Sequence, residues 1–202
     1  MILYITIIVL STAICAVLNI FFNPSNQPWY YYAIYSVIFT ISLIIIDAIV
    51  AITIRKMPER FFQKDKRAYR LSKGEKKFYD LIGVKKWKEK VPELGGFTSF
   101  HKDHVADPFN NDYIERFILE ARYGISIHLW SVPLGFLVIF LDYQMFSGTS
   151  SLYLTMAIPL ACINAILVVA PAFILKYNLP KLLKIRDHNL RLREKANEKS
   201  PS

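Results

Sequence analysis

Four long apolar stretches constrain this chain more than any other feature of its sequence. A helix that crosses a bilayer needs about 20 mainly apolar residues to cover roughly 30 Å of hydrocarbon. Four stretches reach that length: Met1–Phe22, Trp29–Ile54, Gly124–Phe146 and Ser151–Leu175. Their charged residues and histidines are Asp47, His128 and Asp142. Because lipid offers no hydrogen-bond partner to an exposed backbone, we expect each stretch to be a transmembrane helix.

Positive charge is confined to two parts of the chain. Of the 25 Lys and Arg residues, 17 lie between Arg55 and Arg122 and 8 lie from Lys176 onward, whereas the connections 23–28 and 147–150 have none. Basic residues beside membrane spans favour the cytosolic side. The sequence therefore predicts a multi-pass protein of the cell membrane with both termini in the cytosol. The net charge of +9 is better explained by anionic lipid headgroups than by nucleic acid.

The predicted fold is an all-α integral membrane protein with four transmembrane helices in two hairpins. Residues 1–54 form the first hairpin and residues 124–175 the second. Between them, residues 55–123 form a cytosolic segment, and residues 176–202 form a basic cytosolic tail. A connection as long as the middle segment usually has a function of its own. Its aromatic side chains are interspersed with Lys and Arg, which predicts a helical layer lying on the membrane interface.

Two helix starts are visible in the middle segment. Ser72 and Glu75 have the spacing of a capping box, in which each side chain accepts a hydrogen bond from the backbone N–H of the other. Asp112 and Glu115 repeat this spacing. The second start leads into an apolar stripe at i, i+3, i+4 and i+7, formed by Ile114, Phe117, Ile118 and Ala121. We expect this second helix to continue directly into the third span.

Ionisable residues inside the spans are costly and are therefore candidates for function. His128 lies about two helical turns beyond Arg122 in the third span, and Asp47 lies at a similar depth in the second. Asp47 either orients the imidazole of His128 or joins two helices through a polar contact, and His128 either serves chemistry or bonds to a neighbouring helix. Glu120 either lines the same substrate path or pairs with Arg116, four residues earlier on the helix.

Histidines also occur in the middle segment, at His101 and His104. Together with Asp107 they resemble metal-binding and acyltransferase motifs, but the spacing matches neither, because the H-x-x-x-x-D pattern would need an Asp where Ala106 or Phe109 stands. A metal site is the less favoured alternative. We expect a polar loop at the interface with His104 as a candidate base, and neither a metal nor a cofactor.

Several short motifs, taken in order, resemble those of a known family of membrane enzymes. The motifs are Arg55-Lys56-Met57-Pro58-Glu59-Arg60-Phe61-Phe62, Val84-Lys85-Lys86-Trp87-Lys88, Glu120-Ala121-Arg122 followed by Ile127-His128 and Pro133, and Lys176-Tyr177-Asn178-Leu179-Pro180-Lys181-Leu182. Their order and spacing over residues 55–186 are similar to those of the glycosyl-4,4'-diaponeurosporenoate acyltransferases of staphyloxanthin biosynthesis.

The resemblance implies transfer of a fatty acyl group from an acyl thioester to a sugar hydroxyl of a membrane glycolipid, with a glycosylated carotenoid-like acceptor. A general base acting on the hydroxyl would be sufficient, so no covalent enzyme intermediate is required. The predicted catalytic residues are His128, Glu120 and His104. The predicted substrate-binding residues are Arg122, Trp87, Lys88, Lys176, Tyr177 and Asn178.

Two other functions stay open on the sequence alone. The same residues fit a non-catalytic membrane protein that binds anionic lipid or supports a partner enzyme, with Glu120 and His128 as packing and headgroup contacts. Asp47, Asp142 and the prolines of the spans fit a small transporter, although four spans leave little room for a pathway.

Overall fold

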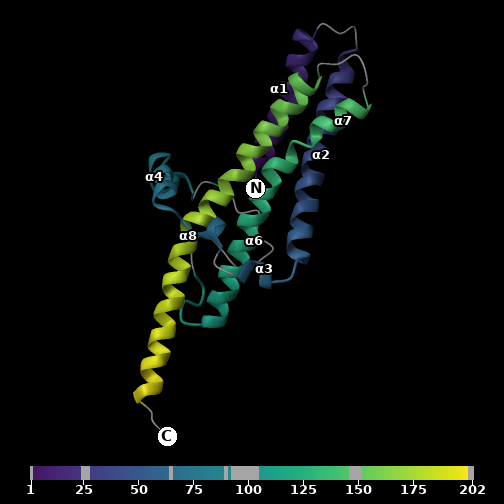
Figure 1. Cartoon of the computed structure of the whole chain (residues 1–202). Helices are drawn as coiled ribbons and strands as arrows, with labels where there is room; N and C mark the ends of the chain where they lie inside the picture. The colour runs from purple at the N-terminus through teal and green to yellow at the C-terminus, as the bar shows by residue number, and fades with distance from the viewer. Residues whose placement is uncertain are drawn as a thin grey trace. The chain divides into compact units, whose positions relative to one another are not determined.

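Helices account for the regular structure of the described part of the chain, which contains no strand (Figure 1). The computed structural model describes residues 2–23, 28–63, 66–88, 91, 105–145 and 152–199, with the side chains of 142–145, 153, 197 and 199 excepted. The four long helices are α1 (Ile2–Phe22), α2 (Trp29–Lys56), α6 (Asn111–Gly135) and α8 (Ile158–Lys199). The short elements are α3 (Arg60–Gln63), η1 (Arg67–Tyr69), α4 (Lys73–Leu81), α5 (Val84–Trp87), α7 (Val138–Met145) and the π-helix η2 (Tyr153–Ala157).

Among the described residues, four helical segments are long and apolar enough to cross a membrane, which confirms the predicted number. They are Ile2–Phe22, Trp29–Lys56, Asn111–Leu141 and Leu154–Ala196. The last two extend beyond the apolar stretches of the sequence. Helix α6 begins well before Gly124 because the amphipathic helix runs directly into the third span, as predicted. Helix α8 continues past Leu175 through most of the basic tail.

Helix α6 begins two residues earlier than the spacing of Asp112 and Glu115 suggested. Asn110 Oδ1 accepts hydrogen bonds from the backbone N–H groups of Asp112 at 3.0 Å and Tyr113 at 3.2 Å. The cap is therefore Asn110, and Asp112 lies inside the first turn. The prediction of a helix start at Asp112 is wrong because the side chain of Asn110 reaches these N–H groups first.

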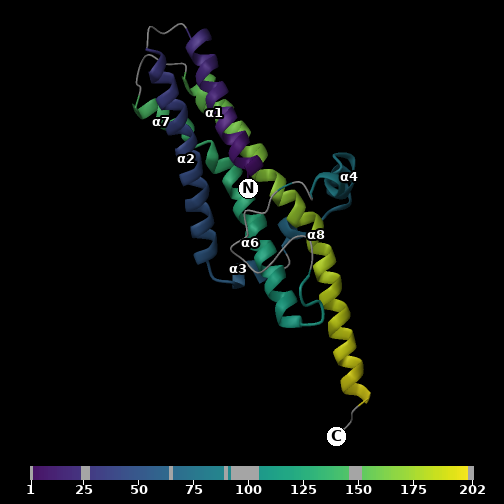
Figure 2. The same ribbon diagram turned by 180° about the vertical axis from the view of Figure 1, so that it is seen from behind.

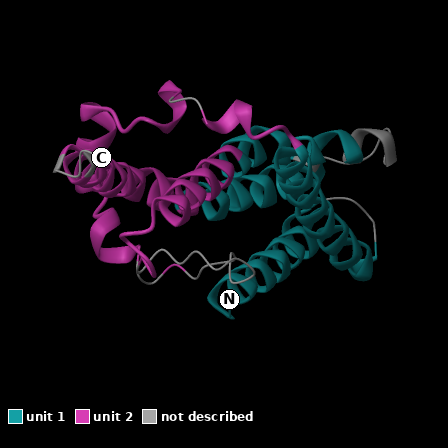
Figure 3. Ribbon diagram, turned by 90° about the horizontal axis from the view of Figure 1, so that it is seen from below, with its two compact units in different colours: residues 1–56, 127–170 teal, residues 57–126, 171–202 magenta. Residues whose placement is uncertain are grey.

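The described helices group into two units (Figure 3). Unit 1 contains residues 1–56 and 127–170, and unit 2 contains residues 57–126 and 171–202. Helices α6 and α8 each contribute to both units.

In unit 1, helix α1 lies alongside α2 (Figure 2), and η2 packs on both. Buried apolar side chains from these elements, α7 and the start of α8 form one core: Cys15, Tyr32, Phe39, Leu43, Val138, Leu152, Met156, Ala157, Leu160 and Ala161.

Polar contacts also join the helices of unit 1. The hydroxyl oxygens of Thr12 and Thr40 lie 2.8 Å apart and link α1 to α2. Asn164 Nδ2 of α8 donates a hydrogen bond to Asp47 Oδ2 of α2 at 3.1 Å. Asp47 therefore joins two helices through a polar contact, which is one of the two roles that the sequence left open for it.

Asn19 of α1 and Thr155 of η2 form a reciprocal pair. Asn19 Nδ2 donates to the Thr155 carbonyl at 3.0 Å, and Thr155 Oγ1 donates to Asn19 Oδ1 at 2.6 Å. A π-helix departs from the regular hydrogen-bond pattern of an α-helix. In lipid, its backbone groups need partners from within the protein. Asn19 supplies such a partner to η2.

Unit 2 is held together by contacts of α6 with the short elements. The apolar stripe predicted on α6 is confirmed, since each of its four side chains is buried. The rings of Phe62 and Tyr123 have their centroids 4.5 Å apart, which packs α3 on α6. The hydroxyl oxygens of Tyr69 and Ser126 lie 2.9 Å apart, which links η1 to the same helix.

Gly124 brings α6 close to α8 within unit 2. A Cβ atom added at Gly124 would lie 2.6 Å from Leu175 Cδ1, so a larger residue would force the Leu175 side chain to move.

Helix α4 is attached to α8 at two positions that flank Leu175, namely Phe173 and Lys176. The ring centroids of Tyr79 and Phe173 are 4.9 Å apart, and Glu75 forms an ion pair with Lys176. The predicted capping box is confirmed: Ser72 Oγ accepts from Glu75 N at 3.1 Å, and Glu75 Oε2 accepts from Ser72 N at 2.8 Å. Glu75 thus both caps α4 and ties it to α8.

The reciprocal pair in unit 1 can be measured by a double-mutant cycle. Asn19→Ala and Thr155→Ala should each lower the thermal stability of the detergent-solubilised protein, and the double variant should lose less than the sum. The coupling should be about 0.6 kcal/mol, the average for hydrogen bonds between membrane helices, and no more than about 1.7 kcal/mol. Thr6→Ala is the control, because Thr6 Oγ1 bonds to Ile2 O of its own helix. Strictly additive losses would contradict the pairing.

The attachment of α4 should depend on pH through Glu75. Burial raises the pKa of Glu75, but hydrogen bonds from Lys176 and Ser72 and the charge of Lys176 outweigh it, so the net pKa lies below the ordinary value of 4.5. A carboxyl group whose pKa is lowered by folding stabilises the protein above its unfolded pKa, and this contribution is lost as the pH falls through the folded pKa.

The thermal stability of the wild type should therefore fall more steeply below pH 4.5 than that of Glu75→Gln. Asp80→Asn, which removes an exposed carboxylate from the same helix, should behave as the wild type does. Equal slopes in the wild type and Glu75→Gln would show that Glu75 does not contribute.

Candidate functional site

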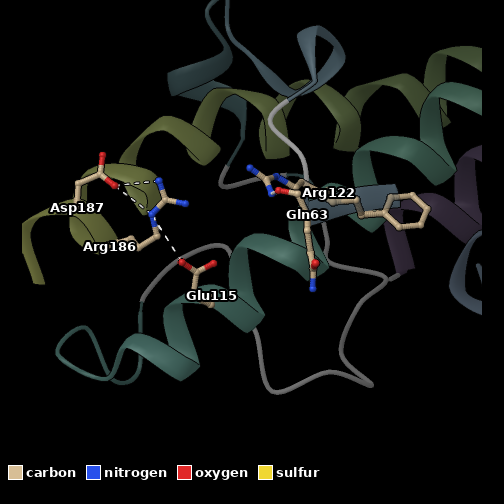
Figure 4. Close-up of polar contacts among 6 residues, drawn as sticks. Gln63, Glu115, Arg122, Arg186 and Asp187 are labelled. Atoms are coloured by element: carbon tan, nitrogen blue, oxygen red, sulfur yellow. Dashed lines mark hydrogen bonds and ion pairs between the residues drawn. The ribbon is translucent and has the colours of Figure 1, made fainter. Parts of the chain in front are cut away.

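Unit 2 contains an open pocket of about 310 Å³, at the small end of the roughly 300–1,000 Å³ common for small-molecule sites. Six of its nine lining residues are charged, three acidic and three basic. Figure 4 shows several of its polar contacts. The lining residues are Glu59, Gln63, Asp112, Glu115, Arg116, Ile118, Leu119, Arg122 and Arg186.

Arg116 links two carboxylates at this pocket. Its Nη1 lies 3.0 Å from Glu59 Oε1, and its Nη2 lies 2.8 Å from Glu120 Oε1. The Glu120 side chain is only 10% exposed, whereas Glu59 and Arg116 are about half exposed. The pairing of Glu120 with Arg116, which the sequence offered as one alternative, is therefore confirmed. Glu59, 57 residues away from Arg116 in the sequence, completes the network.

Arg122 is buried and contacts the chain at the end of α3. Its Nη1 donates to the carbonyl oxygens of Phe62 at 3.1 Å and Gln63 at 2.7 Å (Figure 4). Its guanidinium carbon also lies 5.7 Å from the ring centroid of Tyr69. Arg122 is only 5% exposed, and its contacts hold α3 and η1 against α6.

Arg186 of α8 lies between two carboxylates, as Figure 4 shows. Its Nε is 3.7 Å from Glu115 Oε1 of α6, and its Nη2 is 2.9 Å from Asp187 Oδ1. The first contact crosses from α8 to α6, so it forms one wall of the pocket.

The three guanidinium groups of the pocket all contact oxygen atoms of the protein itself. Three carboxylates in the lining offset their charge, so the lining is formally neutral. A ligand there meets donors and acceptors in similar number, without the excess of positive charge that a phosphate site needs. This composition fits a neutral ligand with several hydroxyl groups.

The predicted group Lys176, Tyr177 and Asn178 lies on α8 in unit 2, outside the lining of the pocket. Lys176 forms an ion pair with Glu75. Lys181 Nζ lies over the ring of Tyr177, 5.6 Å from the ring centroid. Asn178 Oδ1 is buried and has no hydrogen-bond partner among the described residues.

The other predicted residues are spread over the chain. Trp87 Nε1 donates to Ile82 O at 2.9 Å, and Lys88 follows directly after α5. Both belong to unit 2 but do not line the pocket. His128 belongs to unit 1, where its side chain is half-buried. His104 lies outside the described residues.

The pocket therefore brings together part of the predicted site and adds residues that sequence reasoning missed. Arg122 lines it, and Glu120 joins it through Arg116. Glu115 and Arg186 were missed because nothing in the local sequence signals a contact between positions so far apart. Glu59 occurs in the first of the motifs that carried the family resemblance, and this was the available signal for it.

Comparison with known protein families identifies a family for this chain. A family model described as glycosyl-4,4'-diaponeurosporenoate acyltransferase matches residues 58–188. Searches of curated proteins and of solved structures found nothing similar. The matched range covers more than half of the chain and includes every residue that lines the pocket. The chain therefore belongs to the glycosyl-4,4'-diaponeurosporenoate acyltransferase family, a family of membrane acyltransferases.

Proposed function

We propose that this protein transfers a fatty acyl group from an acyl thioester to a sugar hydroxyl of a membrane glycolipid. The observation that carries the proposal is the position of the family match. It begins one residue before Glu59 and ends two residues after Arg186, so it encloses the whole lining of the pocket. Four helices able to cross a membrane agree with an acceptor that is itself a lipid.

The pocket suits the sugar of the acceptor better than the phosphates of a donor. Sugar hydroxyls both donate and accept hydrogen bonds, so the carboxylates and guanidinium groups of the lining can each serve them. The phosphates of a carrier would instead meet three carboxylates, Glu59, Asp112 and Glu115. We therefore propose that the pocket binds the sugar.

The sequence analysis predicted that Arg122 and Lys176 bind substrate. Under the present proposal they instead hold neighbouring elements of the protein in position. Arg122 is engaged by two backbone carbonyls and Lys176 by Glu75. Loss of the Arg122 contacts would loosen α3, which contributes Gln63 to the pocket, and loss of the Lys176 contact would loosen α4. A misplacement of this kind is costly to an enzyme that depends on orientation.

The proposed reaction needs one general base. The base removes the proton of a sugar hydroxyl, and the hydroxyl oxygen attacks the carbonyl carbon of the thioester. The carbon–sulfur bond then breaks, the thiol leaves with a proton, and the sugar keeps the acyl ester. His128 is the proposed base, with His104 as the second histidine, because imidazole is the commonest general base near neutral pH. Glu120, which forms an ion pair with Arg116, is the residue proposed to orient the sugar.

Acyl transfer should fall when these groups are changed. His128→Gln should lose about 10²–10⁴-fold in kcat, the usual contribution of a general base. Glu120→Gln should raise the KM for the acceptor, because the charge that accepts a sugar hydroxyl is removed, while the KM for the donor stays unchanged. The assay follows transfer from a labelled acyl thioester to a glycolipid in detergent.

Controls of matched chemistry are available on the same chain. His188→Gln and Asp80→Asn alter an exposed histidine and an exposed carboxylate that do not line the pocket, and both variants should keep full turnover. Full turnover in His128→Gln, Glu120→Gln and His104→Gln, with folding kept, would show that the site is wrong. Failure of the wild type to acylate any glycolipid would reject the proposed reaction itself.

We further propose that both termini and residues 55–123 face the cytosol, where acyl thioesters are made. The argument is the position of all 25 Lys and Arg residues in the middle segment and the tail. In a background without Cys15 and Cys162, single cysteines at Ser25 and Ser150 should react with an impermeant thiol reagent from outside. A cysteine at Ser72 should react only after permeabilisation, and its labelling in intact cells would overturn this orientation.

A further inference from the structure

Helices α4 and α5, together the α4–α5 segment (residues 73–88), expose an apolar face. Leu81 is 84% exposed, Phe78 47% and Ile82 37%. Positions i, i+3 and i+4 lie on the same side of a helix, so these three side chains share one face. A contiguous exposed apolar patch commonly marks a surface that another molecule or a membrane covers.

The same segment is rich in lysine. The segment has six lysines and two acidic residues, and the acidic residues are already engaged, Glu75 by Lys176 and Asp80 by Lys76 at 3.5 Å. The exposed lysines are Lys73, Lys76, Lys77, Lys85 and Lys86. The surface that the segment presents is therefore both basic and apolar.

The α4–α5 segment is attached to α8 where the apolar run of that helix ends. Phe173 contacts the rings of Phe78 at 6.0 Å and Tyr79 at 4.9 Å, and Lys176 pairs with Glu75. Residues 158–175 of α8 contain no Lys, Arg, Asp or Glu, and Lys176 is the first of these. In a spanning helix such a transition marks the boundary between hydrocarbon and headgroups. The attachment thus holds α4 at the depth of the membrane surface.

We propose that the α4–α5 segment is a membrane-surface element, with Leu81 and Phe78 among the acyl chains and its lysines on anionic phospholipid headgroups. A bilayer offers both parts of this chemistry at the depth where the segment is held. The long lysine side chains can reach headgroups while the apolar face stays below them. The segment would fix the level of unit 2 relative to the membrane surface.

Spin-label accessibility in the full-length protein tests this placement. A nitroxide is attached at Leu81→Cys or, as the matched control, at Asp80→Cys, in a Cys15→Ala/Cys162→Ala background. The protein is reconstituted in nanodiscs of phosphatidylcholine with phosphatidylglycerol. Oxygen, which concentrates in lipid, should relax the label at position 81 several-fold more than a water-soluble nickel chelate does. The label at position 80 should show the reverse order.

A second arm tests the part played by charge. In nanodiscs of phosphatidylcholine alone, or after replacement of the five exposed lysines by Gln, the label at position 81 should become several-fold more accessible to nickel. Equal accessibility in both lipid mixtures would overturn the role of anionic headgroups. Nickel accessibility at position 81 equal to that at position 80 would show a segment in water. Exclusion of both oxygen and nickel from position 81 would show that protein covers this face. A segment in water and a segment covered by protein would each overturn the proposal.

Discussion

Hydrocarbon offers no hydrogen-bond partner, and this constraint determines how the polar side chains of unit 1 are arranged. Asn19 donates a hydrogen bond to a carbonyl oxygen of the π-helix and accepts one from the hydroxyl group of Thr155. Asp47 receives an amide N–H from Asn164. Each pair joins two elements that are distant in sequence, so the groups that lipid would leave unsatisfied become the contacts that fix neighbouring helices. The same constraint explains why an irregular element such as η2 occurs next to Asn19, with its Met156 and Ala157 side chains buried in the core of unit 1.

At the ends of the apolar stretches, the groups that need partners are charged side chains as well as hydrogen-bonding groups. Arg122 and Lys176 are the first cations beyond the apolar stretches of their helices, and both form contacts within unit 2. Arg122 donates hydrogen bonds to two backbone carbonyls and lies over the ring of Tyr69, and Lys176 forms an ion pair with Glu75. Through these contacts, Arg122 holds α3 and η1, and Lys176 holds α4. Cations used in this way are poorly suited to bind a phosphate, and this is why we assign the open pocket to a neutral, hydroxyl-rich ligand.

The features that follow a local pattern could be predicted from the sequence. The apolar stretches, the Ser72 cap and the buried stripe of α6 each depend on residues within a few turns of one another. The sequence did not predict the Asn110 cap, because Asp112 offers an equally good local signal. It also did not predict the contacts of Arg116 with Glu59 and of Arg186 with Glu115. Ion pairs between distant positions leave no periodic trace, since surface charges are common and many pairings are compatible with one sequence.

The depth proposed for the pocket follows from one contact within unit 2 and from the positions of Arg122 and Lys176 in the sequence. Gly124 packs on Leu175, the last apolar residue before Lys176, and Arg122 lies half a turn before Gly124 on α6. The pocket extends from Arg122 toward the start of α6, which is the aqueous side if the boundary lies where the sequence predicts it, at Arg122 and Lys176. On the proposed function, a glycolipid presents its sugar at this level while its tail stays in the lipid. The enzyme then need not extract the acceptor from the membrane. The free energy of binding can be used to orient one hydroxyl toward a donor that arrives from water.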